Sequence, residues 1–189
     1  DRVDVSHFRL SIHLVVAFII LCLIFWNYLN LKNIILPLKK LNFYIPFCFL
    51  ILIFTQLIIG AFVSGMDAGK IYNTWPLMGT SYFPDDNKII DLFKISVFND
   101  RSLVQFLHRN LAYIIFIFYL FILFKIYKKN MHQFFYSVNI LGISLLTQII
   151  LGIFTVLSGA SIIVASLHQF SSILLMSSAL YFLYKNRFS

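Results

Sequence analysis

Three histidines and one arginine are the side chains of this chain that could carry chemistry. His108 and Arg109 are neighbours in the stretch Ser102–Tyr113, just inside an apolar run that continues to Phe124. His13 and His168 lie in two other apolar runs. Ionisable side chains inside such runs are costly and mark functional sites in membranes. An imidazole there can bind a metal or carry a proton, and a guanidinium can neutralise a carboxylate.

The composition is that of a membrane protein. Of the 189 residues, 60% are hydrophobic and only 12% are charged, about half the charged fraction of a soluble domain. The apolar residues come in long runs rather than in amphipathic periods, which predicts a polytopic helical membrane protein. The net charge of +8 is carried by lysines in short loops. Positive loops set membrane topology, so we expect no nucleic-acid partner.

Five runs have the length of about 20 residues that a transmembrane helix needs. They predict an all-α fold with helices at Phe8–Tyr28, Tyr44–Gly65, Ser102–Tyr127, Phe134–Leu157 and Ser161–Tyr184. The lysine-bearing connections after the first and third helices, and the tail, belong on the inner side. The N-terminal segment, the long loop 66–101 and the tight turn at Ser158–Ala160 then lie outside.

An internal repeat divides the chain. Thr55–Gly60 and Thr147–Gly152 share the pattern Thr-Gln-x-x-x-Gly, and each is followed by a helix with a histidine near its outer end. Two such units predict a four-helix bundle over residues 44–189, with the long outer loop at 66–101. Residues 1–43 are predicted to be the last helix of a second, incomplete bundle plus an inner loop. An outside N-terminus without a signal sequence leads us to expect further helices upstream.

The three histidines lie at one depth, roughly 8–10 Å below the outer interface at the helical rise. Two histidines from two helices, with small residues around them, suit a bis-imidazole haem, and Arg109 could neutralise a propionate. Zinc is less favoured because no carboxylate or thiol accompanies the histidines. A proton or ion path is less favoured because the spans contain no Asp or Glu. Histidines that only pack, in a transporter or assembly module, remain an alternative.

Longer motifs resemble haem A synthase. They are GMDAGKIYNTWPLMG at Gly65–Gly79, LVQFLHRNLAY at Leu103–Tyr113, TQIILGIFTVLSG at Thr147–Gly159, LHQ at Leu167–Gln169 and RVDVSHFRLSIHL at Arg2–Leu14. The resemblance covers essentially the whole chain. That family has eight spans in two pseudo-symmetric four-helix halves, so this chain looks like the fourth to eighth. It is similar to the branch of mitochondria and related bacteria, which lacks paired outer-loop cysteines.

The resemblance implies an oxidoreductase that converts the C8 methyl group of haem O to a formyl group, giving haem A for cytochrome c oxidase. It implies that His108 and His168 are axial ligands of a haem b iron, with Arg109 in the same cofactor site. His13 would be a ligand of the substrate haem, with its partner ligand upstream of Asp1. As a fragment, the chain is expected to bind haem b but not to turn over haem O.

The resemblance also implies a multi-pass protein of a bacterial inner membrane or of the mitochondrial inner membrane. Its partners would be membrane lipid and the substrate haem O, with haem O synthase as a candidate. The electron donor is not specified, and a homo-oligomer is compatible with the pattern. The alternative function is that of an electron-transfer b-type cytochrome, a membrane subunit without substrate chemistry.

Overall fold

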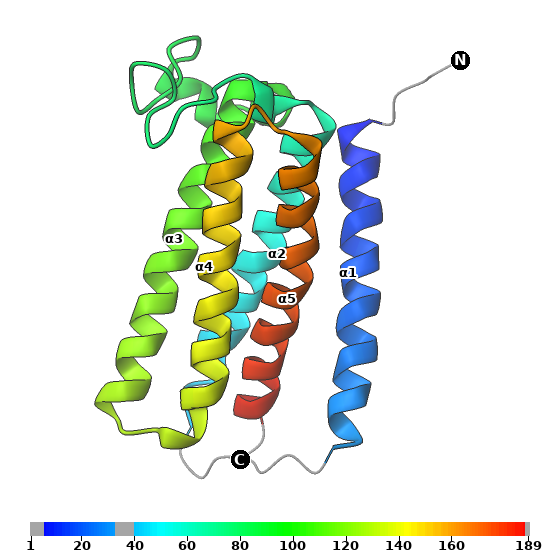
Figure 1. Ribbon diagram of the computed structural model, residues 1–189, viewed down its shortest axis with the longest axis vertical. Coiled ribbons are helices and arrows are strands. Elements are labelled where there is room, and N and C mark those ends of the chain that lie inside the picture. The colour runs from blue at the N-terminus through cyan, green and yellow to red at the C-terminus, as the bar shows by residue number, and fades with distance from the viewer. Residues whose placement is uncertain (1–5, 33–39, 188–189) are drawn as a thin grey trace.

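Five long helices make up the computed structural model, which describes residues 6–32 and 40–187. They are α1 (His7–Asn30), α2 (Tyr44–Gly65), α3 (Arg101–Lys128), α4 (Phe135–Leu157) and α5 (Ile162–Arg187) (Figure 1). All five are long and apolar enough to cross a membrane. The predicted all-α, five-helix fold is confirmed. Both predicted ends of α2 coincide with the observed ends, and the largest difference elsewhere is the extension of α5 from Tyr184 to Arg187.

Helices α2 to α5 form a bundle, and α1 stands beside it against α2 and α5 (Figure 1). The bundle core is apolar and continuous, with Phe49, Ile122, Leu141 and Met176 almost fully buried. From α1, Phe18 reaches this core. Much of the remaining apolar surface of α1 is exposed, as expected for a helix in contact with lipid. The predicted division into residues 1–43 and 44–189 stays a prediction.

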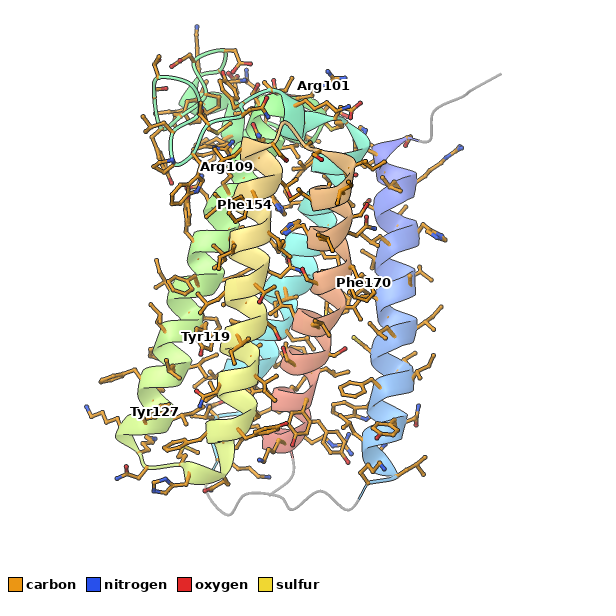
Figure 2. The ribbon with its side chains drawn as sticks, viewed as in Figure 1. Arg101, Arg109, Tyr119, Tyr127, Phe154 and Phe170 are labelled. Atoms are coloured by element: carbon orange, nitrogen blue, oxygen red, sulfur yellow. The ribbon has the colours of Figure 1, made fainter. Side chains whose placement is uncertain are left out.

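The contact between α3 and α4 depends on one glycine. A Cβ atom at Gly142 would lie 2.0 Å from the Tyr119 hydroxyl oxygen and 2.6 Å from ring atom Cζ. Tyr119 lies about two-thirds of the way along α3 (Figure 2) and donates a hydrogen bond to the Val138 carbonyl at 3.3 Å. The absence of a side chain at residue 142 therefore lets the tyrosine lie against the backbone of α4.

The last turn of α5 joins α1 and α2 at the inner end of the molecule. Asn186 is buried, accepts a hydrogen bond from Leu41 N at 3.0 Å and donates one to Leu41 O at 3.1 Å. The Tyr184 hydroxyl donates to the carbonyl of Leu29 in α1. The Arg187 guanidinium lies over the Trp26 ring, 4.1 Å from its centre. One helical turn thus holds the end of α1 and the approach to α2.

At the outer end, a long connection and a tight turn complete the fold. The connection between α2 and α3 contains three short 3₁₀ helices, η1 (Ala68–Lys70), η2 (Ile89–Phe93) and η3 (Ile95–Asn99). The predicted turn between α4 and α5 is confirmed, with Gly159 and Ala160 at φ values of 67° and 58°. The end of α1, the start of α2 and the α3–α4 connection lie at the opposite end of the bundle (Figure 1), as the topology prediction requires.

Candidate cofactor site

The two histidines predicted to act together lie near the outer ends of α3 and α5. His108 meets the neighbouring helix α2, and His168 meets the neighbouring helix α4. Both residues are half-buried. Each member of the predicted pair thus lies against the helix that precedes it in the bundle. That the two act on one cofactor stays a prediction.

Each imidazole lies against a glycine of the preceding helix. A Cβ atom at Gly60 would be 3.0 Å from Cε1 of His108, and one at Gly152 would be 3.2 Å from Cε1 of His168. Both distances are tighter than ordinary side-chain contacts, so a larger residue would push the ring away. These glycines were not predicted as site residues. Their repeated spacing, four residues after Gln56 and Gln148, places each on the same helical face as its glutamine.

Each histidine is also fixed through its backbone by a glutamine of the same neighbouring helix. Gln56 Nε2 donates to the carbonyl of His108 at 3.0 Å, and Gln148 Nε2 donates to the carbonyl of His168 at 3.0 Å. The prediction that both glutamines form hydrogen bonds between helices is confirmed. Glutamine and glycine together form a cradle that appears once in each repeat unit. We call it the Gln-Gly cradle: Gln56 and Gly60 for His108, Gln148 and Gly152 for His168.

The ring nitrogens of the pair have unused bonding capacity. Nδ1 of His108 and Nδ1 of His168 are buried and have no hydrogen-bond partner among the described residues. A buried polar atom without a partner is costly unless something else satisfies it. Within the same described residues, no group of three or more His, Cys, Asp or Glu side chains gathers. Two imidazoles without carboxylate or thiolate are a donor set that fits a haem, and a structural zinc site normally requires four ligands.

Arg109 has a different set of neighbours from His108. Its guanidinium donates to the carbonyls of Tyr72 at 2.8 Å, Thr74 at 2.8 Å and Leu77 at 3.3 Å. Adjacent residues of a helix point about 100° apart. His108 therefore faces α2, while Arg109, labelled in Figure 2, faces the outer loop. Nε of Arg109 has no hydrogen-bond partner among the residues described. A contact with a haem propionate stays a prediction.

The outer loop lies along the same face of α3. Gln105 donates to the Tyr72 carbonyl at 2.9 Å, and the indole of Trp75 donates to the Tyr113 hydroxyl at 3.1 Å. Asn73 extends the connection to the end of α4 through the carbonyl of Val156. Carbonyl groups of a loop need donors when they leave water. Arg109 and its neighbours on α3 supply them, so the loop is a braced part of the outer end.

A carboxylate reinforces the junction between loop and helix. Asp86 accepts hydrogen bonds from Ser102 at 2.6 Å and Tyr72 at 3.0 Å. Burial alone would raise the pKa of Asp86, but these bonds and that of Asn87 outweigh it and lower the pKa below its ordinary value. Desolvation, followed by the hydrogen bond and the charge of Asp86, raises the pKa of Tyr72. Asp86 thus stays an acceptor and Tyr72 a donor over the physiological range.

His13 is not part of this constellation. It lies on α1 with an exposed side chain, and no hydrogen bond or ring contact joins it to His108 or His168 in the described structure. The equal depth of the three histidines stays a sequence-based prediction. That His13 binds a second, substrate haem also stays a prediction.

Comparisons with known proteins agree on one family. A family model described as "Cytochrome oxidase assembly protein", COX15-CtaA, matches residues 1–180. A protein of Pelagibacter ubique named "Heme A synthase" is 49% identical over 187 residues, which are 97% of this chain and 54% of the relative. Proteins of the same name from Rickettsia prowazekii and Wolbachia pipientis are each 37% identical, over 97% and 95% of this chain and 56% and 51% of the relatives.

The matches thus cover nearly all of this chain but only part of each relative. The chain spans about half the length of the curated relatives that it matches. Both cradles and the outer loop lie within the matched residues.

Proposed function

The chain belongs to the COX15-CtaA family of cytochrome oxidase assembly proteins, and we propose that it serves in a haem A synthase by holding a b-type haem between His108 and His168. The reaction is the oxidation of the C8 methyl group of haem O to a formyl group. The relatives that support this proposal are named heme A synthases. The haem would supply a redox-active iron that exchanges single electrons.

The observation that carries the proposal is the matched pair of cradles. Each histidine receives one hydrogen bond on its carbonyl from a glutamine at 3.0 Å. Each ring rests on a glycine and retains a buried nitrogen without a partner. His108 and His168 are held in the same way on two helices that run in the same direction. Such a pair suits the two faces of one haem. Nε2 of His108 lies 3.4 Å from Gln56 Nε2, so one ring nitrogen of the pair is used between helices, and the two Nδ1 atoms are those without a partner among the described residues.

The residues around the pair have separate roles in this proposal. His108 and His168 would bind the iron as neutral imidazoles, and the cradles would fix the rings. The apolar core below them would keep water from the metal. Arg109 would organise the loop through the carbonyls it holds, and its remaining Nε–H would be available to a propionate.

His13 is proposed to bind the substrate haem O at a separate place. Its exposed position on α1 supports a site formed with further helices rather than with the bundle α2–α5. Haem O synthase and an electron donor would be partners of the whole enzyme.

An absorption spectrum of the protein purified from membranes tests the haem site. We expect a Soret band and the sharp α band of a six-coordinate, low-spin haem. His108→Ala and His168→Ala should each lose haem or convert it to a high-spin form. His132→Ala is the matched control, because His132 is exposed at the opposite end of the bundle. A parent protein without a Soret band, or two alanine variants with unchanged spectra, would rule out the site.

Conversion of haem O by the full-length protein then distinguishes the enzyme from an electron-transfer cytochrome. We expect haem A in membranes that contain the protein and haem O. Stable haem b with no haem A, when haem O is present, would instead favour the cytochrome.

A further inference from the structure

A group of large apolar side chains lies outside the five helices, on η2 and η3. Phe93 is 81% exposed and Ile95 is 91% exposed, and Ile89, Ile90 and Phe98 are also exposed. Single exposed apolar residues are ordinary on any protein, but five within ten residues concentrate apolar surface on one short segment. We call this surface the η2–η3 patch.

The patch lies at the level of the outer helix ends, not far above them. The ring of Phe98 contacts that of Phe62 edge to face, with centroids 5.8 Å apart. Phe62 belongs to the last turn of α2 and also contacts Phe8 at the start of α1, at 5.3 Å. In addition, η3 packs against α3. Because α2 just spans the hydrocarbon thickness, its last turn marks the boundary between acyl chains and headgroups.

The backbone of this segment suits an apolar boundary. Its polar groups are paired locally, with Asp91 N, Lys94 N and Val97 N bonded to the carbonyls of Lys88, Asp91 and Lys94. Paired backbone groups lower the cost of leaving water. Asp91, the acid within the segment, is neutralised by Lys94 at 2.7 Å.

Cationic residues border the patch. Lys88 precedes η2, Lys94 separates the two 3₁₀ helices, and Arg101 begins α3, all with exposed side chains. Long cationic side chains at an interface reach phosphate groups while their stems stay on apolar surface. Apolar side chains at the boundary with cations beside them are the arrangement of an interfacial membrane anchor.

We propose that residues 89–98 lie in the outer leaflet of the membrane, with Phe93 and Ile95 among the lipid chains and Lys88 and Lys94 at the headgroups. The patch is continuous, through Phe98 and Phe62, with Phe8, an exposed apolar side chain at the outer end of α1. The long outer loop is then fixed on two sides, by Arg109 and its neighbours on α3 and by the lipid beneath η2 and η3.

Spin labels in the purified protein, reconstituted in phosphatidylcholine–phosphatidylglycerol vesicles, test this proposal. Cys22→Ala and Cys48→Ala remove the native thiols, and single cysteines replace Ile90, Phe93 or Ile95. Collisions with oxygen report lipid, and collisions with a water-soluble nickel chelate report water. We expect oxygen to dominate at the three positions, as at Ile117, an exposed mid-span position of α3. At Thr80, an exposed position in the same loop, the nickel chelate should dominate.

Two results would overturn the proposal. Nickel accessibility at Phe93 and Ile95 equal to that at Thr80 would place the patch in water. Protection from both reagents would show that protein, not lipid, covers the patch. Neither result bears on the haem site, whose test is the absorption spectrum.

Discussion

In each half of the site, two residues of the neighbouring helix position the histidine. The glycine sets how closely the ring approaches the next helix, and the glutamine fixes the carbonyl of the same histidine. The two glutamine bonds have the same length, 3.0 Å, although they join residues 52 and 20 apart in the sequence. The cradle therefore depends on the pairing of adjacent helices and not on the length of the connection between them.

Gln148→Leu should remove one such bond at nearly constant volume. We expect a loss of about 0.5–2 kcal/mol in the free energy of unfolding, the usual range for a hydrogen bond between membrane helices. The measurement is reversible unfolding in detergent micelles or bicelles. Gln56→Leu should give at least as large a loss, because Gln56 Nε2 also lies 3.4 Å from Nε2 of His108.

Thr147→Val is the matched control for Gln148→Leu. Thr147 is exposed, and its hydroxyl bonds only within α4, to the Ile143 carbonyl. Equal losses for Thr147→Val and Gln148→Leu would show that the bond to His168 contributes nothing measurable.

Sequence patterns predicted part of this arrangement and missed another part. The histidine pair and the glutamine bonds follow from the repeat, because helical spacing and membrane depth are local properties. The partners of Arg109 do not, because they are carbonyl groups of Tyr72, Thr74 and Leu77. Every residue has a carbonyl group, so the residue types do not show which carbonyl groups will bind the guanidinium.

Packing between whole helices is less symmetric than the cradles. The repeat offset that relates Gln56 to Gln148 relates Leu50 to Gly142. Only the second unit therefore has a glycine at this level, and Tyr119 fills the space it leaves. Helix limits were predicted well because long apolar runs and flanking charges define them. This contact was not, because it requires knowing which residue of α3 faces which residue of α4.

Gly142→Ala should separate α3 from α4. The new methyl carbon would lie 2.0 Å from the Tyr119 hydroxyl oxygen in a buried interface, so one helix must shift. Overpacking of this kind costs about 1–3 kcal/mol, which the free energy of unfolding would report.

A second substitution tests the cause of that loss. Tyr119→Phe in the Gly142→Ala background removes the closest atom but leaves a ring carbon at 2.6 Å, so we expect partial rescue. Ser144→Ala on the same helix is the control and should be close to neutral. No rescue at all by Tyr119→Phe would place the strain elsewhere.

On the scale of the whole molecule, the two ends are closed in different ways. The outer end is closed by a loop held to α3 and by the tight turn between α4 and α5. The inner end is closed by the last turn of α5, through Asn186 to Leu41 and through Tyr184 to Leu29. These contacts join residues 145 and 155 apart in the sequence, so no local pattern could have predicted them.

Asn186→Leu should weaken the inner end selectively. It leaves the N–H and the carbonyl of Leu41 without their side-chain partner in a buried place. The cost of such orphaned groups is about 2–4 kcal/mol in the free energy of unfolding. Asn186→Asp keeps the acceptor for Leu41 N but sets a buried carboxylate against the Leu41 carbonyl, so it should not recover the stability of the parent.

The haem spectrum provides an internal check on the Asn186 variant. His108 and His168 lie near the opposite end, so the spectrum of folded Asn186→Leu protein should match that of the parent. A changed spectrum with unchanged stability would contradict this separation of the two ends.

The position of Asn186 also has a consequence for biosynthesis. A ribosome delivers α1 and α2 to the membrane well before α5, yet the contacts that lock their inner ends come from the final turn of α5. Until that turn has been inserted, the backbone groups of Leu41 lack their partner. A chain interrupted before Asn186 would thus insert its helices in the membrane without the hydrogen bonds to Leu41. A membrane protease could distinguish this form from the finished protein.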